Sequence, residues 1–264
     1  MGPTQAHSSS YPVHSCQYCG ADLQVLYRFG DVAVPADCQC DLATAERNHR
    51  EQLRQRDEEQ RRQQEDERRY RERLTRSGIP ARYRTGTLSD FDLTHNKAAH
   101  AAATAYVSAF GQHRRDGKGL FLIGEVGRGK TRLATIIALE VLRQGFSVRY
   151  SSTVDLLECI KAEFGTSNAG NTLRCYLDAD LVVLDDIGKE HRTEWSESTI
   201  FQVINDRYER ARPLILTSNL GIDDLRRHYQ WSGDAIVSRI YESCQGILLT
   251  GPDRRLQPPT QKGE

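Results

Sequence analysis

The distribution of apolar and polar positions divides the chain into three zones. Residues 1–41 hold four of the seven cysteines, and residues 46–73 contain only two clearly apolar side chains, Leu53 and Tyr70. From about Ile79 onward, short apolar runs alternate with amphipathic segments. This alternation is typical of an α/β domain with a parallel sheet whose strands are joined by helices.

Five strands are expected at residues 119–124, 146–151, 181–185, 213–218 and 246–250. Five helices are expected at residues 97–113, 130–143, 154–164, 194–210 and 234–244. Each strand except the last is followed by a helix, directly or after a loop. Continuous apolar strands of this length favour a sheet that is buried on both faces.

Residues 46–73 have ten arginines and nine acidic residues, with no Gly or Pro. The segment cannot bury an apolar face, but its Arg, Glu and Gln residues have good helix propensity and opposite charges lie close together. It predicts an exposed helix or a partly ordered tether, which we interpret as a solvated linker. Gly78 and Pro80 are expected to end it.

Composition narrows the functional classes. The 264 residues include 36 Lys+Arg and 36 Asp+Glu, so the formal net charge is zero and nucleic-acid contacts must come from local patches. There is no run of 18 apolar residues, so no membrane span is expected. The N-terminal MGPTQAHSSS has no apolar leader, and seven cysteines is an odd number for a disulfide framework. We expect a cytoplasmic protein.

A phosphate-binding motif follows the first strand of the predicted sheet. The sequence GEVGRGKT fits G-x-x-x-x-G-K-[ST] between a strand and a helix, where backbone N–H groups and the helix N-terminus face a phosphate. In such loops the Lys reaches the β- and γ-phosphates, and the Thr hydroxyl ligates Mg²⁺. The predicted nucleotide-binding residues are Gly124, Glu125, Val126, Gly127, Arg128, Gly129, Lys130, Thr131 and Arg132.

Two further strands end in polar side chains that suit nucleotide hydrolysis. Asp185 and Asp186 end the apolar strand 181–185, where Asp185 is expected to hold Mg²⁺ and Asp186 to orient the attacking water. Glu190 is the alternative for the water, and a helix-capping role is the alternative for Asp186. The strand 213–218 leads to Asn219, whose amide can contact the γ-phosphate and the water. A turn with local hydrogen bonds is the other interpretation of that ending.

An ordered set of segments resembles the DnaC/DnaI-type replicative helicase loaders, and more broadly their IstB relatives, among AAA+ ATPases. The resemblance covers residues 78 to about 255 and implies an AAA+ P-loop NTPase core with no C-terminal lid domain. Besides the phosphate motif, it rests on GIPARY at 78–83, LSDF at 88–91, DLVVLDDIGKE at 180–190, TEW at 193–195, INDRY at 204–208, TSNL at 217–220 and SRIYE at 238–242.

The resemblance also implies roles for single residues. Asn219 is similar to the sensor residue of these ATPases, and Arg239 to the arginine finger that acts on the neighbouring subunit's nucleotide. A surface arginine paired with Glu242 or Asp234 is the alternative for Arg239. Arg254 and Arg255 follow the last strand, where they are expected near the nucleotide.

The segment 154–171 resembles the extra helical element with which loaders meet single-stranded DNA. Lys161 and Arg174 are its available cations, and Phe164 can stack on a base. An amphipathic helix with its apolar side chains in the core is the other interpretation, and both can hold for different faces.

The N-terminal zone contains two close pairs of cysteines: Cys16 with Cys19, and Cys38 with Cys40. Two such pairs supply the four thiolates of a tetrahedral Zn²⁺ site. A module this short has too small a core to be stable without a bound metal or another cross-link. His14 is an alternative ligand, and an iron–sulfur cluster is an alternative to zinc. The remaining cysteines are expected to be buried thiols: Cys159, Cys175 and Cys244.

The residues and the resemblance together predict an ATPase, with ATP, Mg²⁺ and Zn²⁺, that loads a replicative hexameric DnaB-type helicase onto single-stranded DNA and self-associates through its ATPase domain. The expected division is a zinc-binding helicase-interaction module at 1–42, a charged helical linker at 43–77, an AAA+ domain at 78–255 and a disordered tail at 256–264. One alternative is an IstB-like transposition helper that acts on duplex DNA. The other is a nucleotide-gated adaptor with weak hydrolysis, because Asp186 replaces the usual Glu.

Overall fold

The chain forms two compact units, one ending at Glu67 and the other beginning at Arg68. The computed structural model describes residues 14–29, 32–91, 93–167, 169–253 and 255–256. Arg254 and most of the expected tail, residues 257–264, lie outside the described residues. No described helix is both long enough and apolar enough to cross a bilayer.

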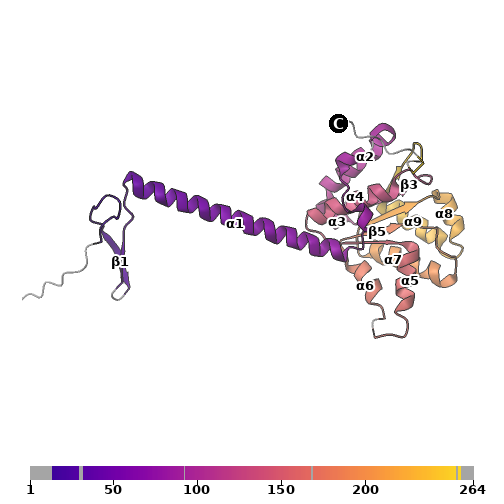
Figure 1. The fold of residues 1–264 in the computed structure, drawn as a ribbon. Helices are drawn as coiled ribbons and strands as arrows, with labels where there is room; N and C mark the ends of the chain where they lie inside the picture. Colours follow the sequence, from indigo (N-terminus) through magenta and orange to yellow (C-terminus); the bar gives the residue numbers. More distant parts are fainter. Residues whose placement is uncertain (1–13, 30–31, 92, 168, 254, 257–264) are drawn as a thin grey trace, which may run out of the picture. The chain divides into compact units, whose positions relative to one another are not determined.

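The first unit contains a small antiparallel hairpin and most of a long helix (Figure 1). Strands β1 (Val25–Phe29) and β2 (Val32–Pro35) pair with Phe29 opposite Val32. Helix α1 (Asp41–Arg76) has 36 residues, of which Ala43 alone is buried among those described. Residues 46–73 therefore form the exposed helix expected from their propensity, rather than a partly ordered tether.

A five-stranded parallel sheet organises the second unit, and this confirms the predicted fold class (Figure 1). Its strand order is β4-β5-β6-β3-β7. The strands are β3 (Gly119–Ile123), β4 (Val148–Ser152), β5 (Leu181–Asp185), β6 (Leu214–Ser218) and β7 (Cys244–Leu248). The chain therefore returns four times to the same sheet, and each of these strands ends at the same edge.

Helices cover both faces of this sheet. One face carries α2 (Leu93–Ser108), α3 (Phe110–Asp116) and α4 (Lys130–Arg143), and the other carries α5 (Thr153–Ala162), α7 (Glu194–Glu209) and α9 (Gly233–Ser243). Successive residues of β5 alternate between the two cores, since Leu181 and Val183 face one cluster and Val182 and Leu184 the other. The near-continuous apolar runs of the sequence reflect this burial on two sides.

Several boundaries differ from the predicted ones. The expected helix 97–113 is two helices, separated at Ala109, and the first is kinked at Asn96. The buried Asn96 side chain exchanges two hydrogen bonds with the backbone of Thr250, which explains the kink. The last strand begins at Cys244 and ends at Leu248, two residues earlier than expected.

Some short elements were not predicted at all. They are the hairpin β1–β2, the helices α6 (Asn171–Asp178) and α8 (Ile222–His228), and the 3-10 turns η1 (Ala81–Tyr83) and η2 (Leu88–Asp90). Helices of seven or eight residues make only two turns and leave little apolar periodicity to recognise.

The guanidinium of Arg207 is the main polar group inside the second unit. It is fully buried on α7 and donates to the backbone carbonyls of Tyr176, Leu177, Ala179 and Pro213. Burial lowers the pKa of Arg207 to about 9. One side chain thus caps the C-terminal end of α6 and fixes the start of β5 and β6.

We expect Arg207→Met to destabilise the second unit by about 3 kcal/mol or more, because several buried carbonyls lose their donor. Both tryptophans of the chain, Trp195 and Trp231, lie in this unit, so urea unfolding followed by their fluorescence reports on it. Arg210→Ala, at an exposed position one turn away, is the matched control and should change stability by less than about 0.5 kcal/mol. Equal midpoints for the two variants would contradict the assigned role.

Candidate functional site

The phosphate loop joins β3 to α4 at the carboxyl edge of the sheet. Gly127 and Gly129 adopt left-handed backbone conformations with φ of 77° and 92°, which glycine tolerates best. Gly129 is the N-cap of α4, so this helix begins at Lys130. A cavity of about 830 Å³ opens over the loop and is lined by Lys130, Thr131 and Arg132 among others. Its position at a helix N-terminus suits an anionic ligand.

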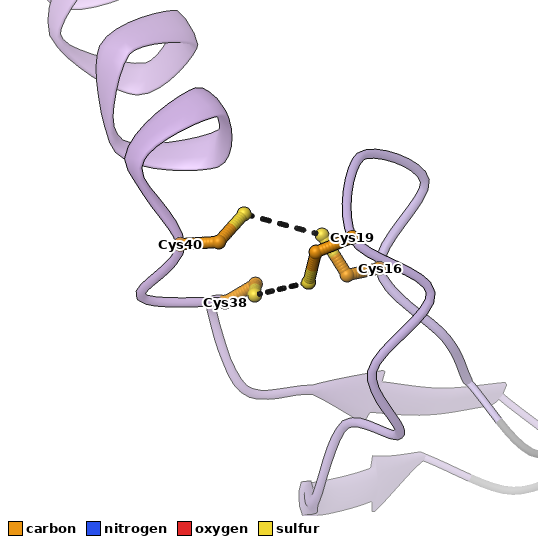
Figure 2. A group of neighbouring side chains, drawn as sticks. All are labelled: Cys16, Cys19, Cys38 and Cys40. Atoms are coloured by element: carbon orange, nitrogen blue, oxygen red, sulfur yellow. Dashed lines mark hydrogen bonds between the residues drawn. The ribbon is translucent and has the colours of Figure 1, made fainter.

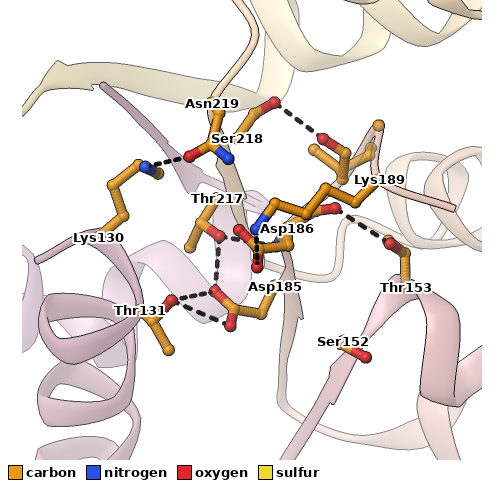
Figure 3. Close-up of polar contacts among 12 residues, drawn as sticks. Lys130, Thr131, Ser152, Thr153, Asp185, Asp186, Lys189, Thr217, Ser218 and Asn219 are labelled. Atoms are coloured by element: carbon orange, nitrogen blue, oxygen red, sulfur yellow. Dashed lines mark hydrogen bonds and ion pairs between the residues drawn. The ribbon is translucent and has the colours of Figure 1, made fainter. Parts of the chain in front are cut away.

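Lys130 is directed into this site by three acceptors. Its Nζ donates to the carbonyl oxygens of Gly124 and Glu125 at 2.7 and 2.8 Å, and to Oδ1 of Asn219 at 2.5 Å (Figure 3). Burial lowers the pKa of Lys130, whereas the charges of Asp186 and Asp185 act in the opposite direction. An arriving phosphate therefore finds a cation that is already oriented.

Asp185 ends β5 and is held by hydroxyl groups from three other elements, of which Figure 3 shows those of Thr131 and Thr217. Thr131 of α4 donates to both carboxylate oxygens at 2.9 and 3.0 Å, Tyr150 of β4 donates at 2.7 Å and Thr217 of β6 at 2.6 Å. Burial, followed by the charge of Asp185, raises the pKa of Tyr150, which keeps its hydroxyl protonated as a donor. A carboxylate beside a Thr hydroxyl is a donor set that Mg²⁺ accepts, so these residues fit the predicted metal site.

Asp186 lies on the wall of the cavity in an unusual backbone conformation. Its φ is 59°, and its N–H donates to the Thr217 hydroxyl at 2.8 Å. The carboxylate forms an ion pair with Lys189 Nζ at 2.6 Å, and Lys189 also lines the cavity. Left-handed backbone at a non-glycine residue is costly and is often found at functional sites.

Glu190, the alternative for orienting water, has its carboxylate buried and hydrogen-bonded within the protein. It is buried and accepts hydrogen bonds from Thr153, Tyr229 and the backbone of Gly188. It does not line the cavity over the phosphate loop. This arrangement favours Asp186 over Glu190 as the residue that faces a nucleotide.

The other predicted loop residues lie around the cavity. Val126 and Arg132 line it, and Arg128 forms an ion pair with Glu125 at the surface. Asn219 lies at the end of β6 and joins the wall beside Lys130. The structure thus brings together Lys130, Thr131, Asp185, Asp186 and Asn219, which come from separate parts of the sequence.

Residues that the sequence did not single out complete the cavity. Arg82, Tyr83 and Gly86 line it ahead of the first strand, and the Arg82 guanidinium lies 4.6 Å from the centre of the Tyr83 ring. Arg255 lines it from the other side, as expected for a residue near the nucleotide. Arg82 and Tyr83 belong to the segment 78–83 of the family resemblance, and their position next to the phosphate loop is a tertiary contact that no local pattern reveals.

Arg239 lies on α9 and does not line the cavity of its own chain. It is half-buried, donates to Oδ1 of Asn205 at 2.5 Å and lies over the rings of Phe201 and Tyr208. Asp234, one of the partners considered, is paired with Arg226 instead. Arg239 is therefore held in place by α7, with no ion pair among the described residues.

The segment 154–171 forms α5 and the turn that leads to α6. Leu156, Leu157 and Ile160 are buried, as the amphipathic interpretation requires. Lys161 and Phe164 are exposed, and the Phe164 ring contacts Trp195 edge to face at 5.6 Å between centroids. An exposed aromatic and a cation thus remain available on the outer face.

The four N-terminal cysteines converge on one point (Figure 2). Their sulfur atoms lie within 4.8 Å of one another, with 3.9 Å between Cys16 and Cys40 and 3.5 Å between Cys19 and Cys38. Tetrahedral zinc with bonds of about 2.3 Å places its sulfurs about 3.8 Å apart, so small side-chain adjustments bring the four sulfurs onto zinc. Hydrogen bonds from the backbone of Cys19 and Tyr18 lower the pKa of Cys16 to about 6, which favours the ligating thiolate.

The remaining cysteines differ from expectation. Cys159 and Cys175 are exposed, so the prediction of buried thiols was wrong for these two. Cys244 is partly buried and packs against the core, with its sulfur 3.7 Å from the Leu214 carbonyl oxygen. Cys159 and Cys175 lie on the short helices α5 and α6, each of which has polar residues as well as apolar ones. His14 is not part of the cysteine cluster.

Comparison with known proteins gives consistent matches. The sequence model of the family described as IstB-like ATP binding protein matches residues 41–261. An ATP-binding protein in an insertion sequence of Mycobacterium tuberculosis is 29% identical over 191 residues, 69% of this chain and 72% of that protein. The replicative helicase loader DnaI of Bacillus subtilis is 28% identical over 149 residues, 53% of this chain and 48% of the loader. The crystal structure of the DnaC helicase loader superposes with a TM-score of 0.59 at 24% identity, covering 65% of this chain and all of that one.

For the cysteine cluster we expect about one Zn²⁺ per chain, bound by the four thiolates, because the cluster has the geometry of a closed structural site. Elemental analysis of protein purified without chelator measures it. Cys40→Ser should lose most of the zinc, whereas Cys159→Ser, which removes an exposed thiol outside the cluster, should keep it. A metal-free protein, or a coloured iron–sulfur cluster, would overturn the assignment.

For the phosphate loop we expect Lys130→Ala to weaken ATP binding by roughly 10- to 100-fold, the loss of one or two hydrogen bonds to a charged group. Calorimetric titration with ATP measures the change, and the thermal unfolding midpoint reports whether the fold is kept. Arg143→Ala, at the far end of the same helix, is the control with unchanged affinity. Normal binding by Lys130→Ala would show that the phosphates lie elsewhere.

Proposed function

The chain belongs to the family of IstB-like ATP-binding proteins, and we propose that within this family it loads a replicative hexameric helicase of the DnaB type onto single-stranded DNA. Its ATPase core has the AAA+ fold, and its activity is that of an ATPase in replication or transposition. The loading role, the single-stranded substrate and the self-association are the parts that we propose.

In the proposed reaction each polar group around the cavity has one task. The loop N–H groups and Lys130 hold the phosphates. Thr131 and Asp185 would hold Mg²⁺, and the bound ion would neutralise part of the phosphate charge. Asp186 orients the attacking water from the cavity wall once its ion pair with Lys189 opens. Asn219, which contacts Lys130 at 2.5 Å, connects the γ-phosphate to β6.

Arg239 is the residue we assign to the neighbouring subunit's nucleotide. It is absent from the lining of its own cavity, and α7 holds it through Asn205, Phe201 and Tyr208. A guanidinium held in this way loses little side-chain entropy when it meets a phosphate. Hydrolysis then depends on assembly, because no chain completes its own site.

The cysteine module is the observation that carries the loader proposal. It lies before residue 41, outside the segment that the family model matches, so it is an addition to the ATPase. Its hairpin exposes large apolar side chains, with Phe29 76% and Val32 65% exposed. Apolar side chains exposed together on a small module are typical of a protein-binding surface, and we assign this surface to the helicase.

Two other functions have support of their own. The Mycobacterium tuberculosis relative belongs to an insertion sequence, which favours a transposition helper acting on duplex DNA. The pairing of Asp186 with Lys189 favours an adaptor that binds ATP and hydrolyses it weakly. A transposition helper acts without a helicase, and an adaptor acts without hydrolysing ATP.

A loading assay separates the three functions. Circular single-stranded DNA is coated with single-strand binding protein, and unwinding of an annealed oligonucleotide by the host's replicative helicase is measured with and without this chain and ATP. The loader predicts unwinding only when both are present. If the chain leaves unwinding unchanged and binds duplex DNA, the loader function is contradicted and the transposition helper is favoured. If loading is complete with a non-hydrolysable ATP analogue, the adaptor with weak hydrolysis is favoured.

Arg239→Ala should bind ATP nearly as the parent does, since its own cavity is intact, but lose assembly-dependent hydrolysis by roughly 10³-fold or more. Lys130→Ala keeps its Arg239 and lacks the phosphate cation. Mixing these two inactive variants should restore part of the activity, because composite sites contain both groups. Two results would contradict this role: normal hydrolysis by Arg239→Ala alone, or an inactive mixture in which both variants still co-assemble. Arg239 would then be a surface arginine without a part in hydrolysis.

A further inference from the structure

A second hollow, of about 550 Å³, lies at the carboxyl edge of the sheet beside the nucleotide cavity. One wall is the loop between β5 and α7, with Lys189 and Arg192, and the other is the turn between α8 and α9, with Gln230 and Trp231. Lys189 lines both hollows. None of the functions assigned above uses Trp231 or this hollow.

The turn that carries Trp231 is held rigidly. Glu197 on α7 is 3% exposed, and its carboxylate accepts from the backbone N–H groups of Gln230, Trp231 and Ser232 at 3.1, 2.6 and 2.5 Å, and from the Ser232 hydroxyl. Trp231 itself is 65% exposed. The backbone of the turn is thus fixed, while the large aromatic ring that it carries faces solvent. Such a ring is suited to stacking on a flat or apolar partner.

The charges that face solvent in this hollow are positive. Its two acids, Glu190 and Glu197, are buried and their oxygens are taken up by internal donors. His191 and Arg192 are exposed, and the Arg192 guanidinium donates only to the His228 carbonyl, at 3.5 Å, among the described residues. It forms no ion pair in that part of the chain. An exposed ring on one wall of the hollow and an unpaired guanidinium on the other suit a base and a neighbouring phosphate of one strand.

We infer that this hollow binds a segment of single-stranded nucleic acid, with one base stacked on Trp231 and a neighbouring phosphate on Arg192. The inference rests on the proposed contact with single-stranded DNA and adds a site separate from the exposed face of α5. A protein partner is the less suitable occupant, because Trp231 is the only large apolar side chain in the lining, whereas the centre of a protein interface is mostly apolar.

The position of the site connects a bound strand to ATP hydrolysis. Lys189 Nζ, between the two hollows, pairs with the Asp186 carboxylate (Figure 3). A phosphate in the hollow attracts Lys189 and weakens this pair, which frees Asp186 to orient water. Single-stranded DNA bound at Trp231 should therefore stimulate hydrolysis without touching the nucleotide.

Tryptophan fluorescence tests the inference directly, because the chain has only two tryptophans. In Trp195→Phe the remaining ring is Trp231, and titration with an oligodeoxythymidylate should quench it in a saturable way that weakens with salt. Fluorescence anisotropy of a labelled oligonucleotide measures total binding in the same samples. If anisotropy shows binding but Trp231 is not quenched, the site at Trp231 is wrong and the proposed DNA contact lies elsewhere. If anisotropy shows no binding, both the site and the proposed DNA contact are contradicted.

Variants in the otherwise unaltered chain give a second test. Trp231→Ala should weaken oligonucleotide binding by roughly tenfold, Trp231→Phe should recover most of it, and Arg192→Ala should weaken it and lower its salt dependence. Arg115→Ala, an exposed cation on α3, is the control. Trp231→Ala should also lose DNA-stimulated hydrolysis while its basal rate stays unchanged. Equal DNA affinity of Trp231→Ala and the parent would overturn the inference. A loss of helicase binding in place of DNA binding would assign the hollow to a protein partner.

Discussion

The carboxylate of Asp185 is the constraint on which the site depends. A charge that is only 6% exposed must be fully hydrogen-bonded, and here the donors are hydroxyls from α4, β4 and β6. Satisfying this one group therefore fixes the start of the phosphate-loop helix and the strands β4 and β6 relative to one another. The same hydroxyl of Thr131 that stabilises the carboxylate is positioned to join it around Mg²⁺.

The segment that follows Asp185 links the nucleotide to the rest of the unit. Asp186 and Lys189 face the nucleotide cavity, whereas Glu190 turns inward and is bound by Thr153 and Tyr229. The inward carboxylate anchors the loop, so the outward pair can rearrange without unfolding it. The proposed response to a neighbouring subunit and to a strand of DNA requires such a fixed support with a movable outer face.

The sequence predicts most of the fold because buried strands leave a strong signal. The strand 181–185 and the helix 130–143 have the bounds of β5 and α4, and both flank motifs with defined backbone requirements. Tyr150 was missed, since its contact with Asp185 joins neighbouring strands that lie 35 residues apart. Arg207 and Glu197 act on the backbone of distant turns, which no local pattern reveals. Glu190 was a plausible alternative to Asp186 until its buried partners were visible.

Manganese binding tests the role of Asp185 most directly. Mn²⁺ can replace Mg²⁺ at oxygen ligands, and electron paramagnetic resonance measures its free concentration during titration in the presence of ATP. We expect one tightly bound Mn²⁺ per chain that depends on ATP, and a loss of metal affinity in Asp185→Asn while ATP still binds without metal. Unchanged Mn²⁺ affinity in Asp185→Asn would contradict this role of Asp185, because the metal would then be held without the carboxylate that organises the site.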